Sequence, residues 1–331
     1  MARVAINGLG RIGRATFKII EETPELELVA VNDLVPPDTL AYLLKYDTVY
    51  GRYQKDVKAD GDSLVVDGRK IKVLKEKDPA QLPWKDMNVD LVFESTGLFT
   101  EEEDAKKHIE AGAKHVIISA PTKSKTVRTV VHSVNGAPED EHVIISCASC
   151  TTNSITPPVE IIGRRIGIKK AMLTTVHAYT STQSIVDSPQ KKVRRGRAAA
   201  ANIVPSSTGA AVATTKVLPE LQGKFDGMAL RVPVPVGSIS DITFVTERPT
   251  SVEEVNNIFR EEAAGKYKGI MDAMEDEIVS SDIVADPHAS IVDLNGTMVV
   301  DGDLLKVTAW YDNEWGYSNQ MIREAKSILS R

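Results

Sequence analysis

The sequence has very little cysteine and no long apolar segment. Only two of its 331 residues are cysteine, Cys147 and Cys150, which excludes a disulfide framework and favours a reducing compartment. No apolar run approaches the roughly 18 residues that a membrane span needs. The first residues also lack the apolar region of a signal peptide. We therefore expect a soluble, cytoplasmic protein with no membrane partner.

The sequence also lacks an excess of positive charge. Lys and Arg number 40 against 46 Asp and Glu, a net charge of −6. Such a chain has no general attraction to nucleic acid or to anionic membranes, so no nucleic-acid partner is expected. The hydrophobic fraction of 42% excludes a disordered chain. At roughly 150 residues per domain, the length predicts two domains.

The first hundred residues alternate between the patterns of strands and helices. Residues 4–6 are an apolar run of strand length, and after a glycine-rich turn Ile12, Thr16 and Ile19 fall on one helical face. A second apolar run at 26–31 completes a strand–helix–strand unit, which is typical of a doubly wound parallel sheet. Asp67-Gly68 between two apolar runs predicts an added antiparallel hairpin.

After residue 150 the pattern changes. Segments rich in Val, Thr and Ile outnumber helical ones and predict an α+β domain. Pro157-Pro158 is expected to interrupt the helix that starts this half, whereas Ser251 and Glu254 predict a helix N-terminus.

Three glycines near the N-terminus predict a dinucleotide site. Gly8, Gly10 and Gly13 have the spacing G-x-G-x-x-G between a strand and a helix, and Asp33 follows at the end of the next strand. Gly8 allows the tight turn, Gly10 lets the backbone approach a pyrophosphate, and Gly13 permits close packing of helix and strand. Asp33 can bind a ribose and would repel the 2′-phosphate of NADP. The alternative is a structural glycine turn with a solvated Asp33.

Cys147 and Cys150 lie between a predicted strand and a predicted helix. They could form a redox pair or half of a zinc site, but no second cysteine pair exists and no metal is expected. As a single nucleophile at a helix N-terminus, a cysteine would have its pKa lowered below the ordinary ~8.5.

A cysteine nucleophile needs a base, and the sequence has six histidines. His177 lies in an apolar and hydroxyl-rich strand, where it is either the base or a buried structural histidine. The other five lie among polar neighbours and are expected at the surface: His108, His115, His132, His142 and His288.

Anion binding is indicated at three places. The basic cluster at 191–197 is a solvated loop or an anion site, and the absence of interleaved aromatic residues argues against nucleic acid. Residues 205–210 combine hydroxyls and glycine in a way that suits an oxyanion or a phosphate. Arg231 lies within an apolar strand, where an unpaired charge would be costly, so it implies an anionic partner.

The motifs at 6–14, 148–153, 174–177 and 310–317 resemble those of phosphorylating glyceraldehyde-3-phosphate dehydrogenases, and the resemblance extends along the whole chain. It implies a Rossmann-type NAD-binding domain at 1–149, completed by a C-terminal helix within about 314–331. It also implies a mixed-sheet catalytic domain at 150–313. The family forms homotetramers, and residues 178–203 resemble the long loop that packs against a neighbouring subunit.

The resemblance also implies roles for individual residues. Cys150 is the nucleophile that forms a thioester with glyceraldehyde 3-phosphate, and His177 is the base. The residues matching cofactor-contact positions are Gly8, Gly10, Arg11, Ile12, Gly13, Asp33, Lys77, Ser119 and Asn313. Those matching the inorganic-phosphate site are Ser149, Thr151, Thr208 and Gly209. Thr180 and Arg231 match the site for the substrate phosphate, and Arg195 lies near both sites.

Two positions depart from the family pattern. Cys147 replaces the usual asparagine, either as a buried small residue or as a second thiol able to resolve an oxidised Cys150. Ser188 replaces a leucine of NAD-specific members, so use of NADP is not excluded. The alternative functions are erythrose-4-phosphate dehydrogenase, which hydrolyses the thioester, and a non-catalytic RNA-binding or regulatory protein.

Overall fold

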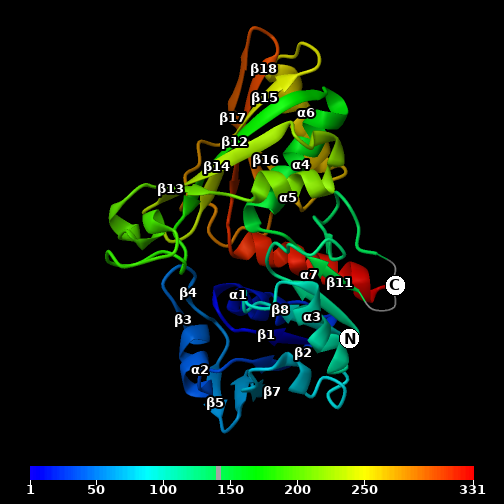
Figure 1. Cartoon of the computed structure of the whole chain (residues 1–331), viewed down its shortest axis with the longest axis vertical. Helices are drawn as coiled ribbons and strands as arrows, with labels where there is room; N and C mark the ends of the chain where they lie inside the picture. The colour runs from blue at the N-terminus through cyan, green and yellow to red at the C-terminus, as the bar shows by residue number, and fades with distance from the viewer. Residues whose placement is uncertain (139–142) are drawn as a thin grey trace. The chain divides into compact units, whose positions relative to one another are not determined.

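The computed structural model describes residues 1–138 and 143–331, which divide into two compact units. The first unit comprises Met1–His132, Gly136–Ala148 and Ser318–Arg331, and the second comprises Ser133–Asn135 and Ser149–Tyr317. Figure 1 colours the chain from blue at the N-terminus to red at the C-terminus. No helix among the described residues is long and apolar enough to cross a membrane.

The first unit is built on a nine-stranded sheet with the order β10-β11-β9-β8-β1-β2-β7-β6-β5. The strands from β10 to β7 pair in parallel, which confirms the predicted doubly wound sheet. The bounds are β1 (Ala2–Asn7), α1 (Arg11–Ile20), β2 (Leu26–Asn32), α2 (Pro37–Lys45), β3 (Tyr46–Asp47), β4 (Gly51–Arg52), β5 (Val57–Asp60), β6 (Ser63–Val66), β7 (Arg69–Leu74), β8 (Leu91–Glu94), α3 (Glu102–Glu110), β9 (His115–Ile118), β10 (Arg128–Thr129) and β11 (Ile144–Ser146).

The antiparallel edge of this sheet follows from a two-residue turn. Val66 pairs with Arg69 across Asp67 and Gly68, whose φ angles of 46° and 85° are the two positive values that a type I′ hairpin requires. The hairpin predicted at Asp67-Gly68 is confirmed. It turns the chain back after β6, so that β7 runs antiparallel to β6.

The second unit contains a mixed seven-stranded sheet with the order β13-β14-β12-β15-β18-β17-β16. This architecture confirms the predicted α+β domain. The bounds are α4 (Cys150–Arg165), β12 (Ile168–Ala178), β13 (Val204–Ser207), α5 (Ala210–Val217), β14 (Phe225–Val232), β15 (Ser238–Thr246), α6 (Val252–Ala264), β16 (Met271–Met274), β17 (Ser290–Val300) and β18 (Leu304–Tyr311). The C-terminal helix α7 (Trp315–Leu329) follows, and four short 3₁₀ turns lie in the loops of the two units: Pro79–Gln81, Val193–Gly196, Ala199–Ala201 and Pro219–Leu221.

Two expectations about helices have different outcomes. Ser251 accepts a hydrogen bond from the amide of Glu254 and starts α6 as predicted. The expected interruption at Pro157-Pro158 is wrong, because α4 runs without a break through both prolines. The prolines remove two backbone hydrogen bonds, but the helix is held by buried side chains on both sides of them, such as Ile155 and Val159.

One face of the second sheet is apolar and exposed. Along β12, Ala171, Leu173 and Thr175 are buried or nearly so while Met172 between them is exposed. Neighbouring strands present Met228, Met298, Val300 and Leu304, which are all exposed. A hollow of about 950 Å³ on this face includes Met172 and Leu304 in its walls. Exposed apolar surface of this kind marks an interaction site.

Candidate functional site

The glycine-rich turn joins β1 to α1 in the geometry that the spacing predicts. Gly8 has a φ of 91°, and a Cβ there would lie 2.8 Å from the Thr96 nitrogen. A Cβ on Gly13 would lie 2.0 Å from the Gly8 oxygen, so only glycine allows α1 to pack this close to β1. A Cβ on Gly10 would meet nothing within 4 Å. The backbone at Gly10 is therefore open to a ligand at the N-terminus of α1.

A cavity of about 530 Å³ lies beside this turn, and all of its lining residues belong to the first unit. It is lined by Asn7, Gly8, Gly10, Asn32, Asp33, Leu34, Glu76, Lys77, Ser95, Thr96, Leu98 and Phe99. The Asp33 carboxylate accepts hydrogen bonds from the amides of Leu9 (2.7 Å) and Val35 (2.9 Å), which fixes its position at the wall.

Four predicted cofactor residues of the first unit do not line the cavity: Arg11, Ile12, Gly13 and Ser119. Arg11 and Ile12 open α1, and Arg11 pairs with Asp47 at 2.6 Å. Ser119 follows β9, where its amide donates to the Glu94 carbonyl at 2.9 Å. Asn313 belongs to the second unit, and its side-chain oxygen accepts hydrogen bonds from the Gly237 amide and the Ser238 hydroxyl.

Cys150 is the first residue of α4, and the preceding turn presents it there. Ser149 caps the helix by accepting a hydrogen bond from the Thr152 amide at 3.1 Å. Ala148 has a φ of 53°, a left-handed conformation that costs a non-glycine residue about 1–2 kcal/mol. Nothing in the sequence predicts this conformation for an alanine. The Ala148 amide compensates in part by donating to the Ser146 hydroxyl at 3.1 Å.

His177 lies beside Cys150. The Cys150 Sγ and the His177 Nε2 are 3.4 Å apart. The His177 Nδ1 lies 2.7 Å from the Ala178 carbonyl oxygen, which can only accept. In the tautomer with its proton on Nδ1, the ring donates to this oxygen and Nε2 presents a lone pair to the thiol. This arrangement can transfer the thiol proton to the ring.

Arg231 is the neighbour of His177 in the sheet. The two residues face each other on the parallel strands β12 and β14, and the Arg231 NH1 donates to the Ala178 carbonyl at 3.0 Å. The same NH1 lies 2.9 Å from the His177 Nδ1. The Arg231 Nε is buried, and no hydrogen-bond acceptor for it is found among the described residues. An acceptor on a bound anion would satisfy this donor.

Burial and Arg231 set the charges of the pair. Desolvation lowers the pKa of His177 to about 3, and the charge of Arg231 acts in the same direction. Desolvation raises the pKa of Cys150 above its usual value, and the opposing effects of Arg231 and of the Thr151 hydroxyl and amide are smaller. The net pKa of Cys150 is therefore raised, contrary to the expectation from its place at a helix N-terminus.

The other predicted anion-binding residues belong to the second unit and already have local partners. The Thr151 hydroxyl bonds to the hydroxyl of Tyr311 at 2.9 Å. Thr208 accepts from the Ala210 amide, and Gly209 is the N-cap of α5. Thr180 bonds to Thr182 at 2.8 Å, and Arg195 donates to the Ser206 hydroxyl at 3.1 Å. A further cavity of about 450 Å³ lies beside Arg195, between the basic loop and β13.

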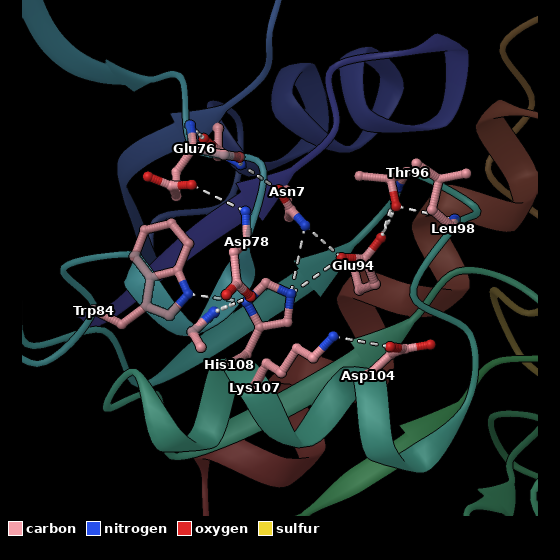
Figure 2. A network of polar contacts seen from close by, with 12 residues as sticks. Asn7, Glu76, Asp78, Trp84, Glu94, Thr96, Leu98, Asp104, Lys107 and His108 are labelled. Carbon is pink, nitrogen blue, oxygen red and sulfur yellow. Dashed lines mark hydrogen bonds and ion pairs between the residues drawn. The ribbon is translucent and has the colours of Figure 1, made fainter.

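The expectation for His108 is wrong, because this residue is completely buried. It lies in a polar network with Trp84 and Glu94, which Figure 2 shows. Its polar neighbours in sequence lie on the outer face of α3, while His108 points to the sheet. His115, His132 and His288 are partly exposed, and His142 lies outside the described residues.

Cys147 follows β11 and is only 3% exposed. Burial raises its pKa well above the usual value, so the thiol is protonated. We predict that iodoacetamide modifies Cys150 in the native protein and leaves Cys147 unmodified, as measured by peptide mass spectrometry.

The same burial predicts that Cys147 does not resolve an oxidised Cys150. After peroxide and then dithiothreitol, the wild type and Cys147→Asn should recover the same fraction of activity. A lower recovery in Cys147→Asn would assign a redox role to Cys147.

Within residues 1–138 and 143–331, no group of three or more His, Cys, Asp or Glu could hold a metal ion.

The sequence matches two protein-family profiles. These are "Glyceraldehyde 3-phosphate dehydrogenase, NAD binding domain" over residues 2–102 and "Glyceraldehyde 3-phosphate dehydrogenase, C-terminal domain" over residues 149–313.

Curated relatives match nearly the whole chain. It is 50% identical to glyceraldehyde-3-phosphate dehydrogenase 2 of Streptomyces avermitilis over 97% of this chain and 96% of the relative. It is 49% identical to the glyceraldehyde-3-phosphate dehydrogenase of Geobacillus stearothermophilus, over 99% and 98% of the two chains. It is 51% identical to that of Thermotoga maritima, over 99% of both.

Proposed function

This chain belongs to the glyceraldehyde-3-phosphate dehydrogenase family, and from that premise we propose that it oxidises D-glyceraldehyde 3-phosphate to 1,3-bisphosphoglycerate with NAD and inorganic phosphate. The observation that carries the proposal is the Cys150–His177 pair at 3.4 Å, with the unpaired Arg231 Nε beside it. A thiol, a base and an anion-binding guanidinium are the groups that this reaction requires of the protein.

The first unit fits a dinucleotide. The open backbone at Gly10 and the N-terminus of α1 suit a pyrophosphate, and the fixed Asp33 carboxylate suits the hydroxyls of an adenosine ribose. When bound, NAD supplies the hydride acceptor. We assign Gly8, Gly10, Arg11, Ile12, Gly13, Asp33, Lys77, Ser119 and Asn313 to its binding.

We predict that Asp33→Gly increases the use of NADP relative to NAD. The change removes the carboxylate that would repel a 2′-phosphate. It also removes the acceptor for the Leu9 and Val35 amides, so kcat/KM with NAD should fall by about tenfold. Steady-state kinetics with both cofactors measure the ratio. An unchanged ratio would show that Asp33 does not select the cofactor.

Cys150 and His177 carry the covalent chemistry. The His177 Nε2 takes the thiol proton as the Cys150 Sγ attacks the aldehyde carbon, and it then passes that proton to the former carbonyl oxygen, which gives a hemithioacetal. In the next step the same nitrogen, after losing that proton, takes the proton of the hemithioacetal hydroxyl as hydride leaves the carbon, which gives a thioester. Because the neutral imidazole is favoured, His177 is ready to act as a base throughout the physiological pH range.

We assign Arg231, Thr180 and Arg195 to the phosphate group of the substrate. The unpaired Arg231 Nε supports this assignment, since a phosphate oxygen would supply the missing acceptor. Binding a group remote from the aldehyde positions the reacting carbon against the Cys150 Sγ.

We predict that Arg231→Ala raises the KM for glyceraldehyde 3-phosphate by about 10- to 100-fold, because a charged hydrogen bond is lost. It should also move the pH profile of Cys150 alkylation to higher pH, since Arg231 opposes the desolvation that raises the thiol pKa. Arg231→Lys keeps the charge without the planar fork. Arg231→Lys should restore the pH profile of alkylation more fully than the KM. Equal restoration of both would show that the planar guanidinium adds nothing to substrate binding beyond its charge.

Ser149, Thr151, Thr208 and Gly209 are assigned to inorganic phosphate, which attacks the thioester and gives an acyl phosphate. Turnover measured by NADH formation with and without phosphate tests the function directly. Multiple turnovers without phosphate would favour thioester hydrolysis, as in erythrose-4-phosphate dehydrogenase. No turnover under either condition would contradict the proposed activity.

We further propose that 1–149 with the helix within about 314–331 binds NAD, that 150–313 is the catalytic domain, and that the protein is a cytoplasmic homotetramer. The exposed apolar face around Met172 supports contact with a second copy of the chain. The free Cys147 and Cys150 support a reducing compartment.

We predict that light scattering gives the mass of a tetramer for the wild type and a smaller mass for Met172→Asp, which puts a charge on the exposed apolar face. A monomeric wild type would contradict the proposed assembly.

A further inference from the structure

A buried polar network runs under the cofactor cavity of the first unit (Figure 2). It begins at Trp84, passes through His108, Glu94 and Asn7, and continues through Asn32 to Glu76. Glu94 and His108 have fully buried side chains. Polar groups this deeply buried are costly unless each donor meets an acceptor, so the direction of every hydrogen bond can be determined.

The direction at one end is set by Trp84. The indole N–H can only donate, and it lies 3.0 Å from the His108 Nδ1. Nδ1 is therefore the acceptor, and the proton of the neutral ring is on Nε2. Nε2 lies 3.1 Å from the Glu94 Oε2 and donates to it.

The direction at the other end is set by the backbone of Glu76. Its amide donates to the Asn32 Oδ1 at 2.8 Å, and its carbonyl accepts from the Asn32 Nδ2 at 2.8 Å. Asn32 Nδ2 then donates to the Asn7 Oδ1 at 2.7 Å. The Asn7 Nδ2 is left to donate to the Glu94 Oε2 at 2.6 Å.

The hydrogen bonds traced from Trp84 and from Glu76 both lead to Glu94, whose carboxyl oxygens accept four hydrogen bonds. Oε2 accepts from His108 and Asn7, and Oε1 accepts from the amide and the hydroxyl of Thr96. Glu94 thus accepts from every donor that faces it, and the Nε2 of His108 is one of these donors.

This carboxylate is hydrogen-bonded to two separate segments of the cavity wall. Asn7, Asn32, Glu76 and Thr96 all line the cavity, whereas Glu94 and His108 do not. The Thr96 hydroxyl also accepts from the Leu98 amide at 3.0 Å, so Oε1 holds the turn after β8. Through Asn7 and Asn32, Oε2 holds the segment at Glu76.

We propose that Glu94, oriented by His108, is a positioning residue for the cofactor, and that the four hydrogen bonds it accepts keep the two walls of the NAD cavity in register. The inference rests on the proposed function, because it takes NAD as the ligand of this cavity. Glu94 does not touch the ligand. It acts through Asn7 and Thr96.

Glu94→Gln tests the proposal, because no orientation of the amide satisfies the network. An NH2 group at Oε1 would face the Thr96 amide, which can only donate. An NH2 group at Oε2 would face the donors of Asn7 and His108. If the Asn7 amide flips to accept from it, the Asn7 NH2 meets the NH2 of Asn32. If His108 changes tautomer to accept from it, the proton on Nδ1 meets the indole N–H of Trp84. We expect the Kd for NAD, measured by calorimetry, to rise at least about tenfold.

The control is Glu103→Gln, the same change on the exposed surface of α3, which should leave the Kd unchanged. At saturating NAD, kcat and the rate of Cys150 alkylation should change less than about twofold in Glu94→Gln. A merely destabilising substitution would lower the folded fraction, measured by circular dichroism, and leave the Kd of the folded protein as it was. That result would overturn the proposal.

Two His108 variants keep the test decisive if Glu94→Gln does not fold. His108→Leu removes the donor to Glu94 and should raise the Kd for NAD, whereas His108→Gln has both a donor for Glu94 and an acceptor for Trp84 and should restore most of the affinity. Equal Kd values for His108→Leu and wild type would overturn the inference. If the wild type itself does not bind NAD, the proposed function fails, and this inference fails with it.

Discussion

Cys150→Ser should lower the dehydrogenase kcat by on the order of 10⁴-fold or more, because removal of a covalent nucleophile leaves only binding and positioning. A serine hydroxyl is far less acidic than a thiol. Steady-state NADH formation measures the loss, and mass spectrometry should detect no thioester.

Cofactor binding provides the internal control for this variant. The cavity beside Gly10 is lined by residues of the first unit, whereas Cys150 starts α4 in the second. Cys150→Ser should therefore bind NAD with the affinity of wild type. Cys147→Ala, which removes a buried thiol with no assigned chemistry, should keep most of the activity. Turnover at the wild-type rate in Cys150→Ser would disprove the assignment of the nucleophile.

His177→Asn should lower kcat by about 10²- to 10⁴-fold, the usual contribution of a positioned general base. The variant removes the acceptor that lies 3.4 Å from the Cys150 Sγ. It should also change the pH profile of Cys150 alkylation, because it replaces the ring nitrogen that lies against the thiol. Rapid-mixing measurements of hydride transfer and the pH profile of alkylation give the two quantities.

The pH profile of the wild type carries a related expectation. Since desolvation and Arg231 lower the pKa of His177 to about 3, the rate should show no inflection near the ordinary imidazole value of ~6.5. The rate should instead rise with pH as the Cys150 thiol ionises, since the pKa of that thiol is raised. His288→Asn, a change at a partly exposed histidine, should keep the wild-type profile. An identical alkylation profile in His177→Asn would show that the two side chains are not coupled.

The sequence by itself determined the features that depend on residues close together in the chain. The glycine spacing at Gly8 and Gly13 predicts the turn because a Cβ at either position would collide with nearby backbone. Asp67-Gly68 predicts the hairpin because both residues must adopt positive φ. Ser251 predicts the start of α6 because it accepts a hydrogen bond from the amide three residues later. Each is a local interaction, so local sequence suffices.

The resemblance to the family identified Cys150, His177 and Arg231, but only the tertiary structure shows what state they are in. His177 and Arg231 are 54 residues apart in sequence and become neighbours because β12 and β14 pair in parallel. Burial by distant segments then reverses the pKa expected for Cys150 from its place at a helix N-terminus. Local sequence contains no information about this desolvation.

The same reason explains why the sequence around His108 predicts a surface position for it. Its neighbours in sequence are polar, but its neighbours in space are Trp84 and Glu94 from the adjoining layer. The backbone of Ala148 is a similar case, since its left-handed conformation is held by packing and by the Ser146 hydroxyl. Sequence determined which groups the protein contains and where its turns lie. Tertiary packing decided which groups meet, which lose water and therefore which charges they carry.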